Sequence, residues 1–195
     1  IGSPLLSFLL CSLCTPLQEY DYIKNSIYKT YLACDAVSEE ILLSHHYRCN
    51  EKIIAFNNQK YYNNKLVINS QSQADTPLIF KNIAGNTTNY KNTAPREAEE
   101  IIEFIKDNPD KSIGVITPFT NQKELIHAML QENGMKDVPC GTVHAFQGDE
   151  KDVVLFSLAL TEQTGQGTYD WLKNNKELIN VATSRAKEQL VIPFL

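Results

Sequence analysis

The sequence predicts an α/β protein with a mostly parallel β-sheet covered by helices on both faces. From about residue 77 onward, short apolar runs that suit strands alternate with longer segments of helical periodicity. One run, Val153–Leu160, is almost wholly apolar, which is typical of a strand buried on both faces of a parallel sheet. The spacing between runs leaves room for helical crossovers between parallel neighbours.

The same patterns place the elements in chain order. We expect helices at Asn50–Phe56, Arg96–Lys106, Asn121–Asn133 and Lys176–Lys187. We expect strands at Pro77–Ile83, Ser112–Thr117, Val138–Val143, Val153–Leu160 and Gln189–Pro193. Polar connecting segments, typical of loops and turns, lie at Tyr61–Asn64, Ser70–Asp75 and Asn86–Thr93.

Several helices carry their own signal. Pro95 suits the first position of a helix because proline fixes φ and lacks the N–H that would have no partner there. The helix that follows it carries one apolar stripe, formed by Ala98, Ile101, Ile102 and Ile105. Gly134 marks the end of the helix that begins near Asn121. Segments Leu5–Leu13 and Tyr20–Leu32 are compatible with helices but lack a clean period.

Composition limits the class of protein. With 195 residues, 43% of them hydrophobic, the chain suits one domain with a substantial core. Its formal net charge of -5 excludes a global positive field, so any nucleic-acid binding must be local. The apolar stretch Leu5–Leu13 is too short to span a membrane. We therefore expect a soluble, cytoplasmic protein that does not bind membranes.

Five cysteines form an odd set, which favours reduced thiols over a disulfide framework. Cys11 and Cys14 form a Cys-x-x-Cys that could bind zinc together with Cys34 and Cys49, or with His45 and His46. A second Cys-x-x-Cys is lacking, so we favour unligated thiols and predict no metal site from this chain.

A polar segment, Gly141–Asp152, lies between two predicted strands and reads Gly-Thr-Val-His-Ala-Phe-Gln-Gly-Asp-Glu-Lys-Asp. Loops at strand ends are where α/β sheets bind ligands. The segment resembles motif V of the superfamily 1 nucleic-acid helicases, a Thr-Val-x-x-Phe-Gln-Gly-x-Glu pattern. The resemblance implies nucleotide contacts by Gln147, Gly148 and Glu150, the last at the ribose, and nucleic-acid contacts by Thr142 and His144.

Two arginines stand in segments that resemble further motifs of these helicases. Asn180–Lys187 is similar to motif VI, which implies that Arg185 reaches the γ-phosphate of ATP across a domain interface. His45–Phe56 is similar to the Tyr-Arg segment of the subgroup that includes RNA-surveillance helicases and replication helicase-nucleases, and Arg48 matches its second phosphate-contacting arginine. A guanidinium suits this role because it is a permanently charged, delocalised fork.

A fourth block, Ile113–Gln122, reads as a strand that ends in Thr-Pro-aromatic and precedes a helix. It resembles the block with which these helicases contact the nucleic-acid backbone, which implies contacts by Thr117 and Pro118. Hydroxyls and helix N–H groups can hold phosphates without basic side chains. The four blocks follow the family's order from about Leu42 to Val191.

The resemblance implies the second, C-terminal RecA-like motor domain (domain 2A), a P-loop NTPase-type three-layer sandwich that lacks the P-loop itself. None of the eight glycines is followed by lysine, so a Gly-Lys-Ser/Thr loop is absent from this sequence. We expect residues 1–40 to be a connecting helical segment and residues 41–195 to be the domain. A first RecA-like domain of the same parent chain would hold ATP and Mg²⁺, and the pair would move 5′ to 3′ along single-stranded DNA or RNA. The sequence starts at Ile1 rather than at a methionine. We therefore expect it to be a piece of a longer protein, and we expect this piece to be inactive alone.

These residues also have plain structural interpretations. Arg48 could pair with Glu51 on the surface, and a lone helical arginine such as Arg185 is usually solvated. Glu150 could simply decorate a loop, and Gly148 could only permit a turn. Thr117 and Pro118 could only end a strand, and Thr142 could only satisfy a backbone group, so these roles are as plausible as nucleic-acid contact. For the whole chain, the alternative is a non-catalytic nucleic-acid-binding or protein-interaction module.

Overall fold

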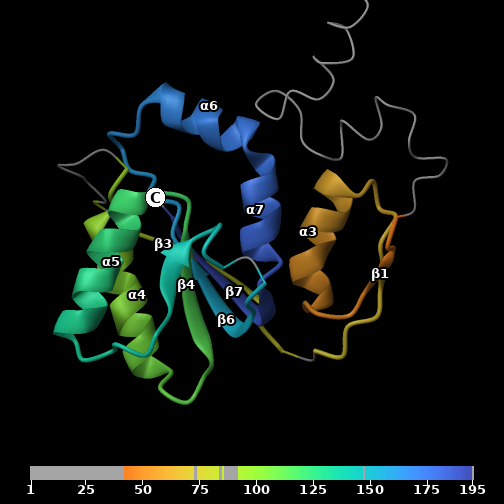
Figure 1. Cartoon of the computed structure of the whole chain (residues 1–195), viewed down its shortest axis with the longest axis horizontal. Helices are drawn as coiled ribbons and strands as arrows, with labels where there is room; N and C mark the ends of the chain where they lie inside the picture. Colours follow the sequence, from red (N-terminus) through yellow and green to blue (C-terminus); the bar gives the residue numbers. More distant parts are fainter. Residues whose placement is uncertain (1–41, 73, 84, 86–91, 147, 195) are drawn as a thin grey trace, which may run out of the picture. The chain divides into compact units, whose positions relative to one another are not determined.

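Five parallel strands form the central sheet in a computed structural model that describes residues 42–72, 74–83, 85, 92–146 and 148–194 (Figure 1). In sheet order the strands are β3 (Leu78–Asn82), β7 (Ala186–Phe194), β6 (Lys151–Phe156), β4 (Ile113–Thr117) and β5 (Cys140–Thr142). All four neighbouring pairs run parallel, so the predicted parallel sheet is confirmed. The expected connecting segment, residues 1–40, and the helices expected within it lie outside the described residues.

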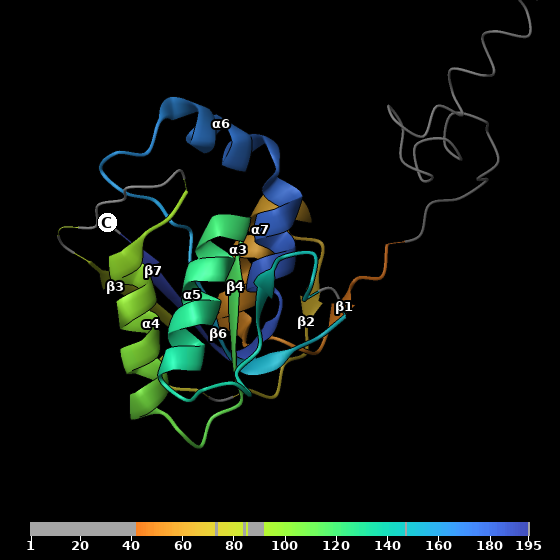
Figure 2. The ribbon, with the colours of Figure 1, turned by 60° about the vertical axis from the view of Figure 1, so that its left-hand side comes forward.

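Helices cover both faces of this sheet, because alternate residues of its strands point to opposite sides. Val153 and Leu155 of β6 pack in a core with α4 (Pro95–Asp107) and α5 (Thr120–Glu132). Their neighbours in β6, Val154 and Phe156, pack in a second core with α3 (Glu51–Tyr61) and α7 (Lys176–Thr183). Figure 2 shows the sheet between the two helix layers. The expected three-layer α/β architecture is therefore confirmed.

The sequence patterns did not predict two very short strands and one helix. β1 (His45–His46) and β2 (Val67–Ile68) form a separate parallel pair, each too short to show a period. Helix α6 (Gln166–Asn174) was not predicted because Gly165 and Gly167 and its polar surroundings resemble a loop.

Some predicted boundaries were wrong. The helix expected at Lys176–Lys187 ends at Thr183, because Ala186 pairs with Lys151 and already belongs to β7. Arg185 therefore lies in the turn between α7 and β7 rather than on a helix. The strand expected to reach Leu160 ends at Phe156, and Ala159 has a positive φ of 50°, which is incompatible with strand geometry.

A loop of residues 143–150 returns the chain from the carboxyl end of β5 to the amino end of β6. Phe146 of this loop is buried against two strand glycines. A Cβ on Gly114 would lie 3.0 Å from Phe146 Cε1, and one on Gly141 would lie 3.0 Å from Phe146 Cδ2. Glycine at these positions lets the ring of Phe146 pack closely against the sheet.

We predict that Gly141→Ala lowers the free energy of unfolding by about 1–3 kcal/mol, because the new methyl group overpacks against Phe146 and Ala145. Urea denaturation measures the change. Gly167→Ala in α6 is the matched control: its Cβ meets open space, so it should stabilise the protein by about 0.5–1 kcal/mol through helix propensity. Equal effects of the two substitutions would contradict this packing.

Candidate functional site

The sheet separates the candidate residues into two groups at opposite edges. Thr117 and Thr142 are the last residues of β4 and β5, at the carboxyl edge. Glu150 and Arg185 immediately precede β6 and β7, at the amino edge. The residues expected to contact nucleotide and those expected to contact nucleic acid thus occupy separate places on one rigid scaffold.

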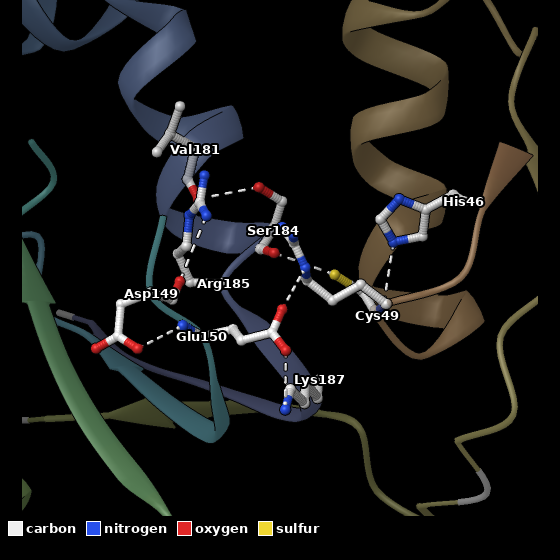
Figure 3. Close-up of polar contacts among 9 residues, drawn as sticks. His46, Cys49, Asp149, Glu150, Val181, Ser184, Arg185 and Lys187 are labelled. Carbon is white, nitrogen blue, oxygen red and sulfur yellow. Dashed lines mark hydrogen bonds and ion pairs between the residues drawn. The ribbon is translucent and has the colours of Figure 1, made fainter. Parts of the chain in front are cut away.

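At the amino edge, Glu150 is the centre of a charged cluster (Figure 3). Its Oε2 lies 2.6 Å from Nε of Arg48, and its Oε1 lies 2.9 Å from Nζ of Lys187. The hydrogen bond from Lys187, with the charges of Lys187 and Arg48, lowers the pKa of Glu150 despite partial burial. Arg48 therefore pairs with Glu150 and not with Glu51, its neighbour on the chain.

Hydrogen bonds join the three segments that carry this cluster. The N–H of Asn50 donates to the carbonyl of Lys187 at 2.7 Å, and the N–H of Lys151 donates to the carbonyl of Arg185 at 3.1 Å. The thiol of Cys49 donates to the carbonyl of Ser184 at 3.3 Å. Arg48, Glu150 and Arg185 come from distant parts of the chain, and these bonds fix their backbones relative to one another.

Cys49 and His46 support the Arg48 segment. Burial raises the pKa of the Cys49 thiol to about 12, so the residue is an unreactive hydrogen-bond donor. Nε2 of His46 accepts the N–H of Cys49 at 3.0 Å, which requires a neutral ring nitrogen. Burial and the charge of Arg48 lower the pKa of His46 and favour that neutral form. Among the described residues, no group of three or more His, Cys, Asp and Glu is arranged to hold a metal.

Arg185 is half-buried in the turn before β7. Its Nη1 donates to the carbonyl of Asp149 at 3.3 Å, while its Nε is buried without a hydrogen-bond partner. Burial, followed by repulsion from Arg48, lowers the pKa of Arg185. An unsatisfied buried donor of this kind is uncommon in folded proteins and indicates a place for an acceptor.

The charges of the cluster do not balance. Arg48, Arg185 and Lys187 supply three positive charges around Glu150. Asp149 acts on Arg185 and pairs with Lys151, and Asp152 acts on Lys187, so the excess over the whole cluster is one positive charge. This local excess stands against the net charge of -5 of the whole chain. Two guanidiniums and an unsatisfied Nε suit the γ-phosphate of a nucleotide, because phosphate oxygens accept several charge-assisted hydrogen bonds at once. The residues present thus fit the ATP that the sequence implies.

Two further candidates of the motif V segment, Gln147 and Gly148, precede Glu150. Gln147 lies outside the described residues. Gly148 is exposed and has a φ of 97°, a left-handed conformation that favours glycine. It turns the chain toward Glu150.

At the carboxyl edge, the four nucleic-acid candidates differ in exposure. Thr117 is fully buried, and its hydroxyl accepts the N–H of Phe119 at 3.3 Å. Pro118 and Thr142 are half-buried, and His144 is exposed on the loop that leaves β5. In this conformation Thr117 shapes the backbone that follows β4, whereas the other three have surface available to a ligand.

Beside Pro118 lies a cleft of about 740 Å³ that sequence reasoning missed. It lies between the residues that begin α5 and those that begin α6, and Ala159 forms part of its wall. Phe119 and Trp171 contribute aromatic rings to its lining. The available signals were the aromatic residue after Pro118 and the single tryptophan of the chain.

A buried polar network holds the wall of this cleft. Oε2 of Glu97 accepts the hydroxyl of Ser157 at 2.7 Å and the N–H of Ala159 at 3.0 Å. Nε2 of Gln122 donates to the same serine hydroxyl at 2.9 Å, and Oε1 of Gln122 accepts the N–H of Ala94 at 2.8 Å. The network connects α4, α5 and the end of β6, and it stabilises the positive φ of Ala159.

We predict that Glu150→Gln makes the protein slightly less stable at neutral pH, because Arg48 and Lys187 lose their shared carboxylate. The folded-state pKa of Glu150 is lowered, so its contribution is present above its ordinary pKa of about 4.3 and is lost as pH falls through the folded pKa. Thermal unfolding at several pH values should show the two proteins converge in acid. Glu162→Gln, an exposed carboxylate outside the cluster, is the control; a difference that does not depend on pH would refute the assignment.

Comparisons with known proteins identify a family and several relatives of this chain. The AAA domain family matches residues 23–193. An uncharacterised ATP-dependent helicase of Methanocaldococcus jannaschii is 28% identical over 207 residues, which cover 91% of this chain and 30% of the relative. The DNA polymerase alpha-associated DNA helicase A of Saccharomyces cerevisiae is 31% identical over 186 residues, covering 75% of this chain and 26% of the relative. The ATP-dependent helicase upf1 of Schizosaccharomyces pombe is 31% identical over 136 residues, covering 62% and 14%.

A solved structure, the C-terminal domain of a possible DNA helicase from Lactobacillus plantarum, has a TM-score of 0.49 and 14% identity over 76% of this chain and 87% of that one. The chain spans less than a third of the length of the curated relatives given above. No helix of the described residues has the length and apolar character needed to cross a membrane. The family match and the helicase relatives together show that the chain belongs to the AAA domain family and is a RecA-like domain of a superfamily 1 helicase.

Proposed function

We propose that this chain is the C-terminal motor domain of an ATP-dependent nucleic-acid helicase, and that Arg48 and Arg185 bind the γ-phosphate of ATP held by a first RecA-like domain. The observation that carries the proposal is the cluster at the amino edge, where two arginines lie close enough to repel and Nε of Arg185 has no acceptor. A helicase made of two such domains binds its nucleotide between them, which agrees with relatives more than three times the length of this chain.

Bound ATP would supply the anion that this cluster lacks, with Mg²⁺ held mainly by the other domain. Arg48 would exchange Glu150 for phosphate oxygens, and Arg185 would complete its hydrogen bonds through Nε. Glu150, still paired with Lys187, would then be free to accept a ribose hydroxyl, with Gly148 and Gln147 beside the nucleotide. The guanidiniums would stabilise negative charge on the transferring phosphoryl group, the role of an arginine finger.

The carboxyl edge of the sheet would bind single-stranded DNA or RNA. Pro118, Thr142 and His144 would contact the strand, and Thr117 would set the backbone that presents its neighbours. Both edges belong to one sheet and would move together. When ATP draws the two motor domains together, the residues at the carboxyl edge would therefore be displaced along the strand. The family resemblance favours 5′ to 3′ movement.

We predict that Arg185→Ala, introduced into the longer protein that carries the ATP-binding loop, lowers nucleic-acid-stimulated ATP turnover by about 10³-fold or more. The turn that holds Arg185 is fixed mainly by backbone hydrogen bonds, so the variant should remain folded. Arg96→Ala is the matched control, because Arg96 forms only an exposed ion pair with Glu99 on α4. Unchanged turnover in folded Arg185→Ala would contradict the arginine-finger role.

A further inference from the structure

The cleft beside Pro118 has the chemistry of a pocket for a flat, neutral group. Among the described residues that line it, none is Asp, Glu, Lys, Arg or His. They include instead hydroxyl groups, among them those of Thr120 and Thr164, next to two aromatic rings. Such a lining can form hydrogen bonds with the edge of a planar ring and van der Waals contacts with its faces, but it does not neutralise a charge.

The two aromatic rings are not equivalent. Phe119 is buried, with 8% of its surface exposed, whereas 40% of Trp171 is exposed. Their ring centroids lie 5.5 Å apart and the ring planes are tilted by 40°. Both rings line the cleft and contact each other, and Trp171, the more exposed of the two, offers more ring surface to it.

The walls of the cleft are well supported. The hydroxyl of Thr168 in α6 donates to Oδ1 of Asn92 at 3.2 Å, which ties α6 to the segment before α4. On the other side, the network of Glu97, Gln122 and Ser157 fixes Ala159. Helix α6 lies over the end of the molecule near the start of α5 (Figure 1). The pocket is thus built between elements that the fold itself holds in place.

We propose that this cleft binds one base of the single strand, with the base stacked on Trp171. The proposal rests on the proposed function, because it needs a strand at the carboxyl edge, and it adds a base-binding subsite to the backbone contacts of Pro118 and Thr142. Stacking on an aromatic ring tolerates any base, since every base has a π-face. In this arrangement the phosphates of the strand contact the carboxyl edge, and one base enters the neutral cleft beside it.

Trp171 is the only tryptophan of the chain, so its fluorescence reports the pocket directly. The protein is titrated with a ten-nucleotide oligothymidylate, with the matching oligouridylate, and with an abasic oligonucleotide of the same length. The two oligonucleotides that carry bases should quench the emission in a saturable way, and the abasic one should not. Quenching by all three alike would overturn the proposal.

Binding of fluorescently labelled oligothymidylate to variants gives a second measurement. Trp171→Ala should weaken binding about tenfold or more, while Trp171→Phe, which keeps a ring, should retain most of it. Tyr169→Ala is the matched control, because Tyr169 is an exposed aromatic of the same helix that does not line the cleft. It should bind as the wild-type protein does.

The outcomes separate this inference from the proposed function. If the wild-type protein binds oligothymidylate and Trp171→Ala binds it equally well, the base subsite is wrong and the strand-binding edge stands. If the wild-type protein binds none of the oligonucleotides, both the subsite and the nucleic-acid side of the proposed function are wrong. A loss of binding in Trp171→Ala together with Trp171→Phe and Tyr169→Ala would indicate a disturbed helix α6 and contradict stacking.

Discussion

Two guanidiniums and one ammonium group lie close together at the amino edge of the sheet, and their mutual repulsion is the constraint on which the site depends. Arg48 and Lys187 both bind Glu150, while Arg185 keeps a buried donor without an acceptor. Like charges at short range repel unless an anion is shared between them. The protein tolerates the arrangement because backbone hydrogen bonds hold the three segments together whatever their side chains bind. In the proposed function, a nucleotide phosphate would relieve this repulsion.

The parallel sheet separates the two groups of candidate residues, so the proposed nucleotide and nucleic-acid contacts would lie at opposite edges of one small domain. Residues before β6 and β7 face one edge, and residues after β4 and β5 face the other. The loop of residues 143–150 runs between these edges over the face of the sheet, and Phe146 fixes it against Gly114 and Gly141. Only a few residues separate Glu150 from Thr142, and Val143 and Phe146 among them are buried. In the proposed function, this segment would link nucleotide state and strand contact within the domain.

The parallel sheet and its two helix layers could be predicted from sequence, because the apolar runs and helical stripes reflect burial directly. The sequence motifs identified Arg48 and Arg185 as candidates, but they did not predict their secondary structure or their partners. Residues after Thr183 include Arg185, Ala186 and Lys187, all good helix formers, yet pairing of β7 with β6 outweighs that local preference. The ion pair of Arg48 with Glu150 joins segments far apart in the chain, which spacing does not reveal. The cleft could not be predicted for a related reason, because its walls come from several elements. In addition, glycines weaken the helical signal in the sequence of α6.

We propose that this chain supplies one half of an ATP site and needs a second domain to hydrolyse ATP. A single experiment tests this by comparing ATP hydrolysis by this chain with that of a longer protein that also carries the ATP-binding loop, each with and without single-stranded nucleic acid. We expect no hydrolysis by the chain alone and stimulated hydrolysis by the longer protein. Hydrolysis by the isolated chain would contradict the proposal, because residues of this chain would then bind and cleave ATP without a partner domain.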